Sequence, residues 1–235
     1  MTAQVITKII YINLSHRKDR RDLMEGQLSK LDIPYERFCA IQPTTESLNI
    51  DGKYNSFYVR SKSPKQMQYN SPHMRLASTP SRAVGEFGCY LSHYFIHKKA
   101  HEEMWANYLI LEDDCKLNAG WLELVNEYVG EGKVPNDWDM IRSLWGELST
   151  KKVERFDSCN RQSKFSTNKI HNTISGGTHF QICKGKSSQK IVNHLESDYV
   201  YNIDSVYSTN KLNVYYSKFN VEQGSLGSDI LYRDN

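Results

Sequence analysis

The chain of 235 residues lacks several features that define whole classes of protein. No uninterrupted apolar run approaches the ~20 residues that a membrane-spanning helix needs. Its five cysteines stand singly, without the CxxC pairs of zinc clusters or the dense spacing of disulfide frameworks. The opening residues, Met1 to Ile6, lack the basic-then-apolar form of a signal peptide. We therefore expect a cytoplasmic protein with reduced thiols.

Acidic residues are missing between Lys53 and Arg82, where six basic residues, three prolines and several aromatic residues occur. This composition predicts a long irregular loop at about residues 51–82. Its charge suits an anionic, sugar-bearing partner or peripheral association with an anionic inner membrane. A solvated loop without a partner is the alternative. Nucleic acid is not expected, because the net charge of the chain is only +3 and no binding motif is present.

Apolar runs that suit strands alternate with helical patterns along the rest of the chain. This alternation predicts an α/β fold with a mostly parallel twisted sheet and helices on both faces, in one domain spanning residues 1–235. Ser15 is the expected N-cap of the first helix. The expected strands cover residues 8–14, 35–41, 108–111, 139–144, 180–184 and 213–217, and the expected helices cover residues 16–31, 80–104, 121–129 and 187–195.

Several apparent motifs do not meet the requirements of their chemistry. His97 and His101 stand four residues apart, but Lys98 occupies the position where a zinc-protease helix needs Glu. We expect both histidines on a solvated helical face. The glycines near residues 85–88 and 176–177 lack the spacing of phosphate-binding loops. No GxSxG sequence indicates a covalent nucleophile.

The most informative feature is a run of apolar residues, Tyr108 to Leu111, that ends on Glu112, Asp113 and Asp114. Four apolar residues in succession suit a central strand that is buried on both faces. Ligands of open α/β sheets bind outside the carboxyl ends of the strands, where these acids would lie. Three adjacent carboxylates repel one another, and a divalent cation carrying a polyphosphate would compensate them. A solvated acidic turn is the alternative.

Four segments, taken together, resemble glycosyltransferase family 25. They are Tyr11 to Arg21 with its INL and DRR sequences, Glu36 to Ile41, the GEFGCYLSH sequence of Gly85 to His93, and the ILEDD sequence of Ile110 to Asp114. Their order and spacing also agree with that family over roughly residues 8–115. The family comprises bacterial lipopolysaccharide and lipooligosaccharide glycosyltransferases, with collagen galactosyltransferases as eukaryotic relatives. The chain resembles a short bacterial member.

The resemblance implies a GT-A fold, a UDP-sugar donor (most often UDP-galactose) and a divalent metal, Mn²⁺ or Mg²⁺. It also implies inversion to a β-linkage on a lipooligosaccharide or lipopolysaccharide acceptor. Asp114 is expected as a direct metal ligand, with Asp113 next, and Glu112 as a contact to the ribose or an indirect support of the metal. His179 is a further candidate for contact with the metal or pyrophosphate, against the alternative of a buried, hydrogen-bonded histidine.

Residues after the first strand are candidates for the donor site. Asn13 and Leu14 would contact the nucleoside, while Arg17, Arg20 or Arg21 would approach phosphate. The alternative for the arginines is an ordinary charged helix face.

An inverting transfer also needs a base that takes the proton of the acceptor hydroxyl. Asp204 and Glu147 are the candidates, because each lies in a partly polar segment after an apolar stretch, and Asp139 is a third. Trp138 and Trp145 are candidates for stacking on a sugar, although either could simply belong to the core.

Two other functions stay open. The first is a catalytically silent protein that binds a nucleotide sugar or a glycan, since a fold does not establish activity. The second is a metal-dependent phosphohydrolase that cleaves a nucleotide sugar with water as acceptor.

Overall fold

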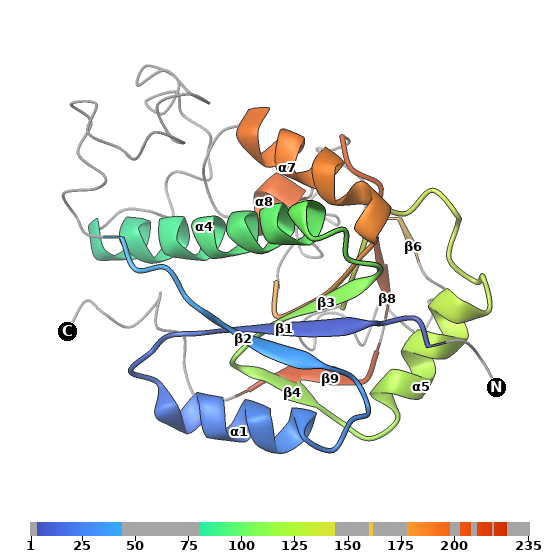
Figure 1. Ribbon diagram of the computed structural model, residues 1–235, viewed down its shortest axis with the longest axis horizontal. Helices are drawn as coiled ribbons and strands as arrows, with labels where there is room; N and C mark the ends of the chain where they lie inside the picture. The colour runs from blue at the N-terminus through green and yellow to red at the C-terminus, as the bar shows by residue number, and fades with distance from the viewer. Residues whose placement is uncertain are drawn as a thin grey trace, which may run out of the picture.

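The computed structural model describes residues 4–43, 80–143, 160–161, 178–197, 203–207, 211–217 and 219–224. Within these ranges the chain forms a seven-stranded sheet with helices on both faces, and a separate two-stranded sheet (Figure 1). None of the described helices combines the length and apolar character needed to cross a membrane.

The main sheet has the strand order β2-β1-β3-β7-β5-β8-β6, and β4 pairs with β9 in the small sheet. The strands are β1 (Lys8–Asn13), β2 (Tyr35–Cys39), β3 (Tyr108–Glu112), β4 (Cys115–Leu117), β5 (Met140–Ser143), β6 (Asn160–Arg161), β7 (Phe180–Cys183), β8 (Val214–Ser217) and β9 (Val221–Gln223). The helical elements are α1 (Lys18–Leu28), α4 (Pro80–Glu102), α5 (Trp121–Val125), the π-helical turn η3 (Asn126–Gly130), the 3₁₀ turn η4 (Gly185–Ser187), α7 (Ser188–Ser197) and α8 (Ile203–Tyr207).

The expected α/β fold, with a mostly parallel sheet and helices on both faces, is confirmed. β1 pairs in parallel with both β2 and β3, and β5 pairs in parallel with β8. β7 runs antiparallel between β3 and β5, and β6 runs antiparallel to β8. Because β7 is reversed, its first residues lie beside the carboxyl ends of its neighbours: Phe180 pairs with Leu111, and Gln181 pairs with Arg142.

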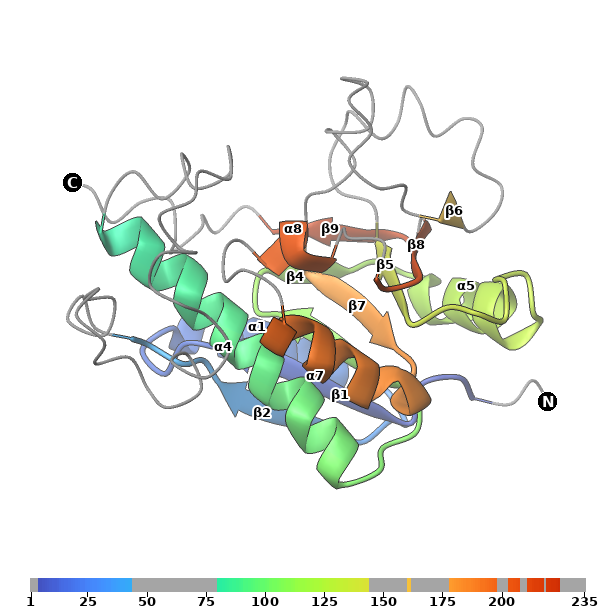
Figure 2. The same ribbon diagram turned by 90° about the horizontal axis from the view of Figure 1, so that it is seen from above.

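Two hydrophobic cores cover the two faces of the sheet. Alternate residues of a strand point to opposite faces, so Ile110 packs under α4 and α7 whereas Leu109 packs toward α1 and α5. Both residues of β3 are fully buried, as expected for a central strand covered on both sides. Seen from above, α4 and α7 lie side by side across the first face (Figure 2).

Helix α1 begins later than the sequence suggested. The chain turns after β1, where the Arg17 amide donates to the Leu14 carbonyl (2.9 Å), and Arg17 rather than Ser15 is the N-cap. The Asn13 side chain donates to the Arg17 carbonyl (3.0 Å), which holds this turn against the end of β1. The expected serine cap is therefore wrong, and the N-cap of α1 makes no side-chain capping hydrogen bond.

The expectation that His97 lies on a solvated face is wrong. Its ring is fully buried, with Nδ1 2.7 Å from the Tyr108 hydroxyl and Nε2 2.7 Å from the Tyr207 hydroxyl. Burial holds the pKa of His97 well below its usual range, so the ring is neutral. His97 thus joins α4 to β3 and α8, while His101 is exposed as expected.

A glycine and a serine of α4 let the chain after β2 pack closely on this helix. Ser92 Oγ donates to the Gly88 carbonyl (2.7 Å) and accepts from the Ile41 amide (3.0 Å). A Cβ atom on Gly88 would collide with the Ile41 carbonyl oxygen and would lie 3.0 Å from Pro43 Cδ. Two residues of the GEFGCYLSH segment therefore have a packing role.

We predict that Gly88→Ala destabilises the protein by about 1–3 kcal/mol, the usual cost of overpacking, because backbone must move to admit the methyl group. Gly26→Ala in α1 is the matched control, since nothing lies within 4 Å of an added Cβ there. That substitution should stabilise by about 0.5–1 kcal/mol through helix propensity. Urea unfolding of both variants measures the difference, and equal stabilities would contradict the close packing at Gly88.

Candidate active site

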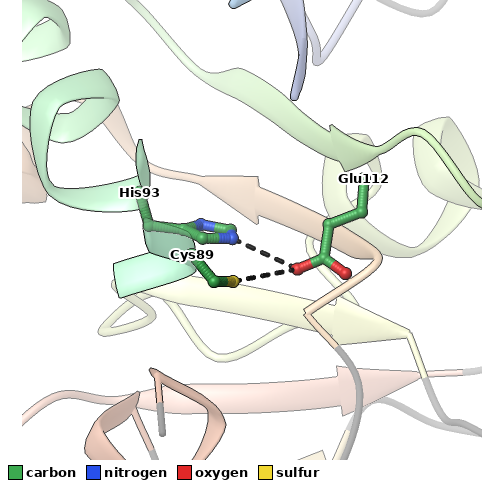
Figure 3. Close-up of side chains that lie close together, drawn as sticks. All are labelled: Cys89, His93 and Glu112. Atoms are coloured by element: carbon green, nitrogen blue, oxygen red, sulfur yellow. Dashed lines mark hydrogen bonds and ion pairs between the residues drawn. The ribbon is translucent and has the colours of Figure 1, made fainter. Parts of the chain in front are cut away.

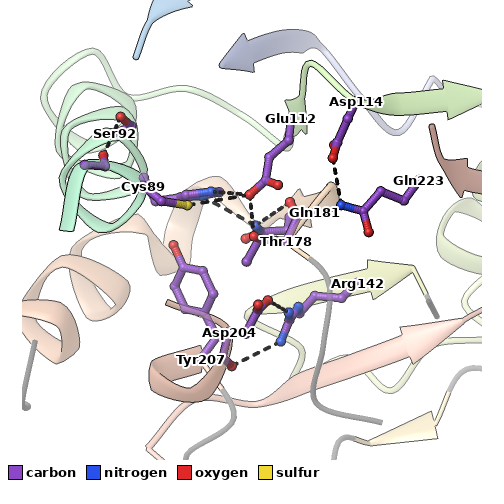
Figure 4. A network of polar contacts seen from close by, with 12 residues as sticks. Cys89, Ser92, Glu112, Asp114, Arg142, Thr178, Gln181, Asp204, Tyr207 and Gln223 are labelled. Atoms are coloured by element: carbon purple, nitrogen blue, oxygen red, sulfur yellow. Dashed lines mark hydrogen bonds and ion pairs between the residues drawn. The ribbon is translucent and has the colours of Figure 1, made fainter. Parts of the chain in front are cut away.

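The acidic end of β3 lies at the carboxyl edge of the sheet, among side chains from five other elements. α4, the segment before β7, β5, α8 and β9 all contribute polar groups to this region (Figure 4). The reversed direction of β7 places His179 here, where its carbonyl accepts from the Glu112 amide (3.1 Å). Residues far apart in the sequence therefore meet at the edge where α/β sheets bind ligands.

Three donors converge on one oxygen of Glu112. Oε1 lies 3.3 Å from His93 Nε2 and 3.7 Å from Cys89 Sγ (Figure 3). It also accepts from the Thr178 hydroxyl (Figure 4). Burial opposes ionisation, but the hydrogen bonds from His93 and Thr178 outweigh it and lower the pKa of Glu112. The carboxylate is therefore ionised and fixed in orientation, and its Oε2 accepts no hydrogen bond from the described residues.

Gln181 contacts two of the residues that donate to Glu112, His93 and Thr178. Its Nε2 donates to the Thr178 carbonyl (2.9 Å) and lies 3.5 Å from His93 Nδ1. With Nδ1 facing an amide NH₂ and Nε2 facing a carboxylate, the contacts suit a His93 ring protonated on Nε2. The Gln181 oxygen is buried and has no partner among the described residues.

Asp113 faces away from Glu112 into a buried network. Its Oδ1 forms an ion pair with Arg20 (2.8 Å), and its Oδ2 accepts from Asn13 (2.7 Å). The Asn13 oxygen in turn accepts from Arg37 (3.0 Å). Burial raises the pKa of Asp113, and the Arg20 and Asn13 hydrogen bonds oppose that rise. The structure thus brings together three predicted site residues, Asn13, Arg20 and Asp113, in contact with one another.

Asp114 has one satisfied and one unsatisfied oxygen. Its Oδ2 accepts from Gln223 of β9 (2.7 Å), while Oδ1 is buried without a partner among the described residues. Burial, together with the negative charge of Glu112, raises the pKa of Asp114 to about 6. A buried carboxylate oxygen without a donor is costly unless a cation or a proton satisfies it.

His179 offers a second unsatisfied ligand atom in the same region. The ring is 1% exposed, and neither of its nitrogens has a partner among the described residues. Burial lowers the pKa of His179 to about 4, against the opposing influence of Glu112. The ring is therefore neutral at pH 7 and keeps a lone pair for a ligand. The charge of Glu112 acts on both His179 and Asp114, so the three residues lie in one neighbourhood.

Asp204 reaches the same region from α8. Its Oδ1 lies 2.5 Å from Arg142 Nη2, and its side chain is 24% exposed, whereas that of Arg142 is almost fully buried. Burial raises the pKa of Asp204, although the Arg142 charge opposes the rise. The charge of Glu112 also contributes, which places Asp204 near the acidic end of β3.

Other predicted residues lie elsewhere or outside the described ranges. Asp139 precedes β5, at the opposite edge of the sheet from Ser143, and it accepts from Ser187 (2.7 Å) and the Asn213 amide (2.8 Å). It therefore anchors β5 and is not placed to act as the base.

Arg17 pairs with Asp19 (2.8 Å), Leu14 is partly exposed, and Trp138 belongs to the core. Glu147, Trp145 and residues 51–79 lie outside the described residues.

Sequence reasoning missed the donors that support the acidic residues. Cys89 and His93 stand four residues apart in α4, which places both on one helical face. That spacing was a usable signal. Thr178, Arg142 and Gln223 had none, because their contacts to the site depend on the packing of distant strands.

A family model described as glycosyltransferase family 25 (LPS biosynthesis protein) matches residues 6–189, more than half of the chain. The chain belongs to glycosyltransferase family 25. The matched range includes β3, the part of α4 that carries Cys89 and His93, and the segment before β7, while Asp204 and Gln223 lie beyond it.

Curated relatives agree with the family membership at modest identity. Procollagen galactosyltransferase 1-A of Xenopus laevis is 29% identical over 57% of the chain, and human procollagen galactosyltransferase 2 is 27% identical over 63%. A probable inactive glycosyltransferase 25 family member 3 of Bos taurus is 30% identical over 57% of the chain. These matches span only 20%, 22% and 21% of the respective relatives' lengths.

We predict that Asp114→Asn stabilises the metal-free protein at about pH 7.5 by roughly 2–3 kcal/mol, the equivalent of a two-unit pKa shift. The folded state binds the Asp114 proton more tightly than the unfolded state, whose carboxyl has a pKa near 3.9. Stability therefore falls as pH rises from about 4 to 6 and stays low above that range. Asn retains an acceptor for Gln223 but cannot ionise.

Urea unfolding with a chelator present checks this effect. The gain should shrink by about half at pH 5, where Asp114 of the unsubstituted protein is largely protonated. An equal gain at both pH values would show that ionisation of Asp114 is not its cause.

Proposed function

We propose that the chain is a glycosyltransferase that transfers galactose from UDP-galactose to a glycan acceptor. The observation that carries this proposal is the acidic end of β3, where Glu112 Oε2 and Asp114 Oδ1 are left without protein donors among the described residues. Family membership and the relatives named procollagen galactosyltransferases support the activity and the sugar. Because the matches span about a fifth of those relatives, the activity remains a proposal for this chain.

We infer that a divalent cation, Mn²⁺ or Mg²⁺, binds at Asp114, whose buried Oδ1 has no donor among the described residues. Glu112 Oε2 would add a second hard oxygen ligand and the neutral His179 ring a nitrogen, but the three atoms do not form a close group in this structure, so binding requires side-chain movement. Bound there, the cation would neutralise the diphosphate leaving group as a Lewis acid. Asp113 differs from its neighbours because both of its oxygens are held by Arg20 and Asn13. Asp113 and Arg20 are proposed to hold the end of β1 in place beside the donor site. Asn13, Leu14 and Arg17 remain the proposed contacts to the UDP-sugar.

Asp204 is the proposed base. The acceptor hydroxyl oxygen attacks the anomeric carbon, its proton passes to an Asp204 carboxylate oxygen, and the bond to UDP breaks on the opposite face, which gives inversion and a β-linkage. Arg142 holds the Asp204 carboxylate in place by its Nη2 contact at 2.5 Å. Burial and the nearby Glu112 charge raise the pKa of Asp204 and make it a better proton acceptor. Glu147 is the second candidate.

A lipooligosaccharide or lipopolysaccharide is the proposed acceptor, and the family description as an LPS biosynthesis protein supports it. A procollagen-like acceptor is the alternative that the animal relatives introduce. Bacterial origin, a single domain over residues 1–235, cytoplasmic location and inner-membrane association through residues 51–82 stay predictions. Incubation of UDP-galactose with truncated lipooligosaccharide and with hydroxylated collagen peptides distinguishes the two acceptors.

A catalytically silent binding protein is the second candidate function, because the name of the Bos taurus relative describes it as a probable inactive family member. It would bind a UDP-sugar without forming a glycosylated product. A phosphohydrolase, the third candidate, would release free sugar or sugar phosphate without any acceptor. Product analysis with and without acceptor separates all three.

Asp114→Asn should abolish transfer and the Mn²⁺-dependent part of UDP binding, because the unsatisfied Oδ1 is replaced or turned away. Glu222→Gln is the matched control: Glu222 neighbours Gln223 on β9, but its side chain is exposed and pairs with Lys116 at 3.4 Å. Removing that surface pair should change activity little. Calorimetry with UDP and Mn²⁺, beside a transfer assay, measures both effects, and normal turnover of Asp114→Asn would refute the proposed metal site.

Asp204→Asn should depress turnover by roughly 10²-fold or more, the usual contribution of a general base. Donor affinity should persist, because the base contacts the acceptor rather than the diphosphate. Glu147→Gln, measured in parallel, separates the two candidates. Loss of UDP binding in Asp204→Asn would instead place this residue in the donor site.

A further inference from the structure

Among the described residues, Cys89, His93 and Glu112 form the one group of three His, Cys, Asp or Glu residues whose ligand atoms all lie within 4.8 Å of one another (Figure 3). Cys89 and His93 lie one turn apart on the same face of α4, and Glu112 ends β3 opposite them. His93 is fully buried, while Cys89 and Glu112 are partly exposed, so the cluster has a side open to solvent.

The two separations measured from Glu112 Oε1 are close to those around a tetrahedral zinc ion, and the third, between Cys89 and His93, lies within 4.8 Å. Zinc bonds of about 2.3 Å to sulfur and about 2.0–2.1 Å to nitrogen and oxygen place ligand atoms roughly 3.3–3.6 Å apart. The observed separations from Glu112 Oε1 are 3.3 Å to His93 Nε2 and 3.7 Å to Cys89 Sγ. Binding would therefore require little movement of α4 or β3.

We propose that Cys89, His93 and Glu112 bind a thiophilic divalent cation, Zn²⁺, with water as the fourth ligand. The ligand set differs from that of the donor site: a thiolate and an imidazole favour zinc or cobalt over manganese and magnesium, which prefer oxygen. The scattered cysteines of the sequence did not indicate such a site, because two of its ligands come from a helix and the third from a strand.

Metal binding would release the Cys89 thiol proton and shift the ring proton of His93. Burial and the negative charge of Glu112 raise the pKa of Cys89, so without metal its sulfur is a thiol. On binding, the S–H bond breaks, its electron pair goes to zinc and the proton passes to solvent. The His93 ring proton moves from Nε2 to Nδ1, which faces Gln181.

Gln181 is suited to support that form of the ring. Its Oε1 has no partner among the described residues, and rotation of its amide presents this oxygen to the Nδ1–H group. Metal-bound histidines regularly donate their second ring N–H to such an acceptor.

Zinc here would also affect transfer, and this consequence rests on the proposed function. The zinc ion would bind Glu112 Oε1 and partly neutralise this carboxylate, which would then attract the donor-site cation less strongly. Zinc is therefore expected to lower transfer in a way that excess Mn²⁺ does not fully reverse. The binding test below needs neither donor nor acceptor, so its failure is distinct from failure of the transferase assignment.

Cobalt(II) titration of the metal-free, reduced full chain tests the site, because a cobalt–thiolate bond gives a charge-transfer band in the near ultraviolet. We expect one equivalent of Co²⁺ to produce the band and one equivalent of Zn²⁺ to remove it. Cys89→Ser, which keeps a hydroxyl donor for Glu112, should lose the band, and His93→Gln should weaken binding by about tenfold or more.

Cys39→Ser is the matched control, because Cys39 is an exposed thiol on β2, outside the cluster. It should leave the band unchanged. Circular dichroism of each variant shows whether the fold is retained. No band in the folded unsubstituted protein, or an undiminished band in folded Cys89→Ser, would overturn the proposal and leave the cluster as a hydrogen-bonded support of Glu112.

Discussion

Repulsion among three adjacent carboxylates at the end of a buried strand is the constraint on which the rest of this structure depends. Each carboxylate is compensated differently. Asp113 is neutralised by a buried arginine and an amide, and Glu112 by three donors on one oxygen. Asp114 receives a single amide donor, and its pKa is raised to about 6 as a result of its burial and of the Glu112 charge. The least compensated oxygens mark where an external cation is most stabilising.

The arrangement of the elements follows from supplying those donors. α1 contributes Arg20 from one face of the sheet, and α4 contributes Cys89 and His93 from the other. Thr178 can reach Glu112 only because β7 is inserted antiparallel, which brings the start of that strand to the carboxyl edge of β3. If this strand ran parallel to β3, the polar residues that precede it, Thr178 and His179, would lie at the opposite edge of the sheet. The mixed sheet is thus linked to the chemistry of the site.

Local patterns predicted β1, α4, β3 and the acidic strand end, because each is encoded by consecutive residues. What could not be predicted depends on partners far away in the sequence. The reversal of β7, the burial of His97 between two tyrosine hydroxyls and the pairing of Asp113 with Arg20 all arise from packing across the sheet. The Ser15 cap failed for a local reason: the chain turns between Leu14 and Arg17, and a hydrogen bond from Asn13 to the Arg17 carbonyl holds that turn. Family resemblance located the site, but not which oxygen of each acid is free.

The two oxygens of Glu112 therefore carry different chemistry. In the proposed arrangement Oε2 serves the donor cation together with Asp114 and His179, a set of oxygen and nitrogen ligands suited to a hard cation. Oε1 belongs with Cys89 and His93, a softer set. Because both sets share one carboxylate, charge withdrawn on one side is lost to the other. In the proposed arrangement the donor site therefore depends on whether Cys89 and His93 of α4 hold a metal, a dependence that an all-oxygen support of Glu112 would not create.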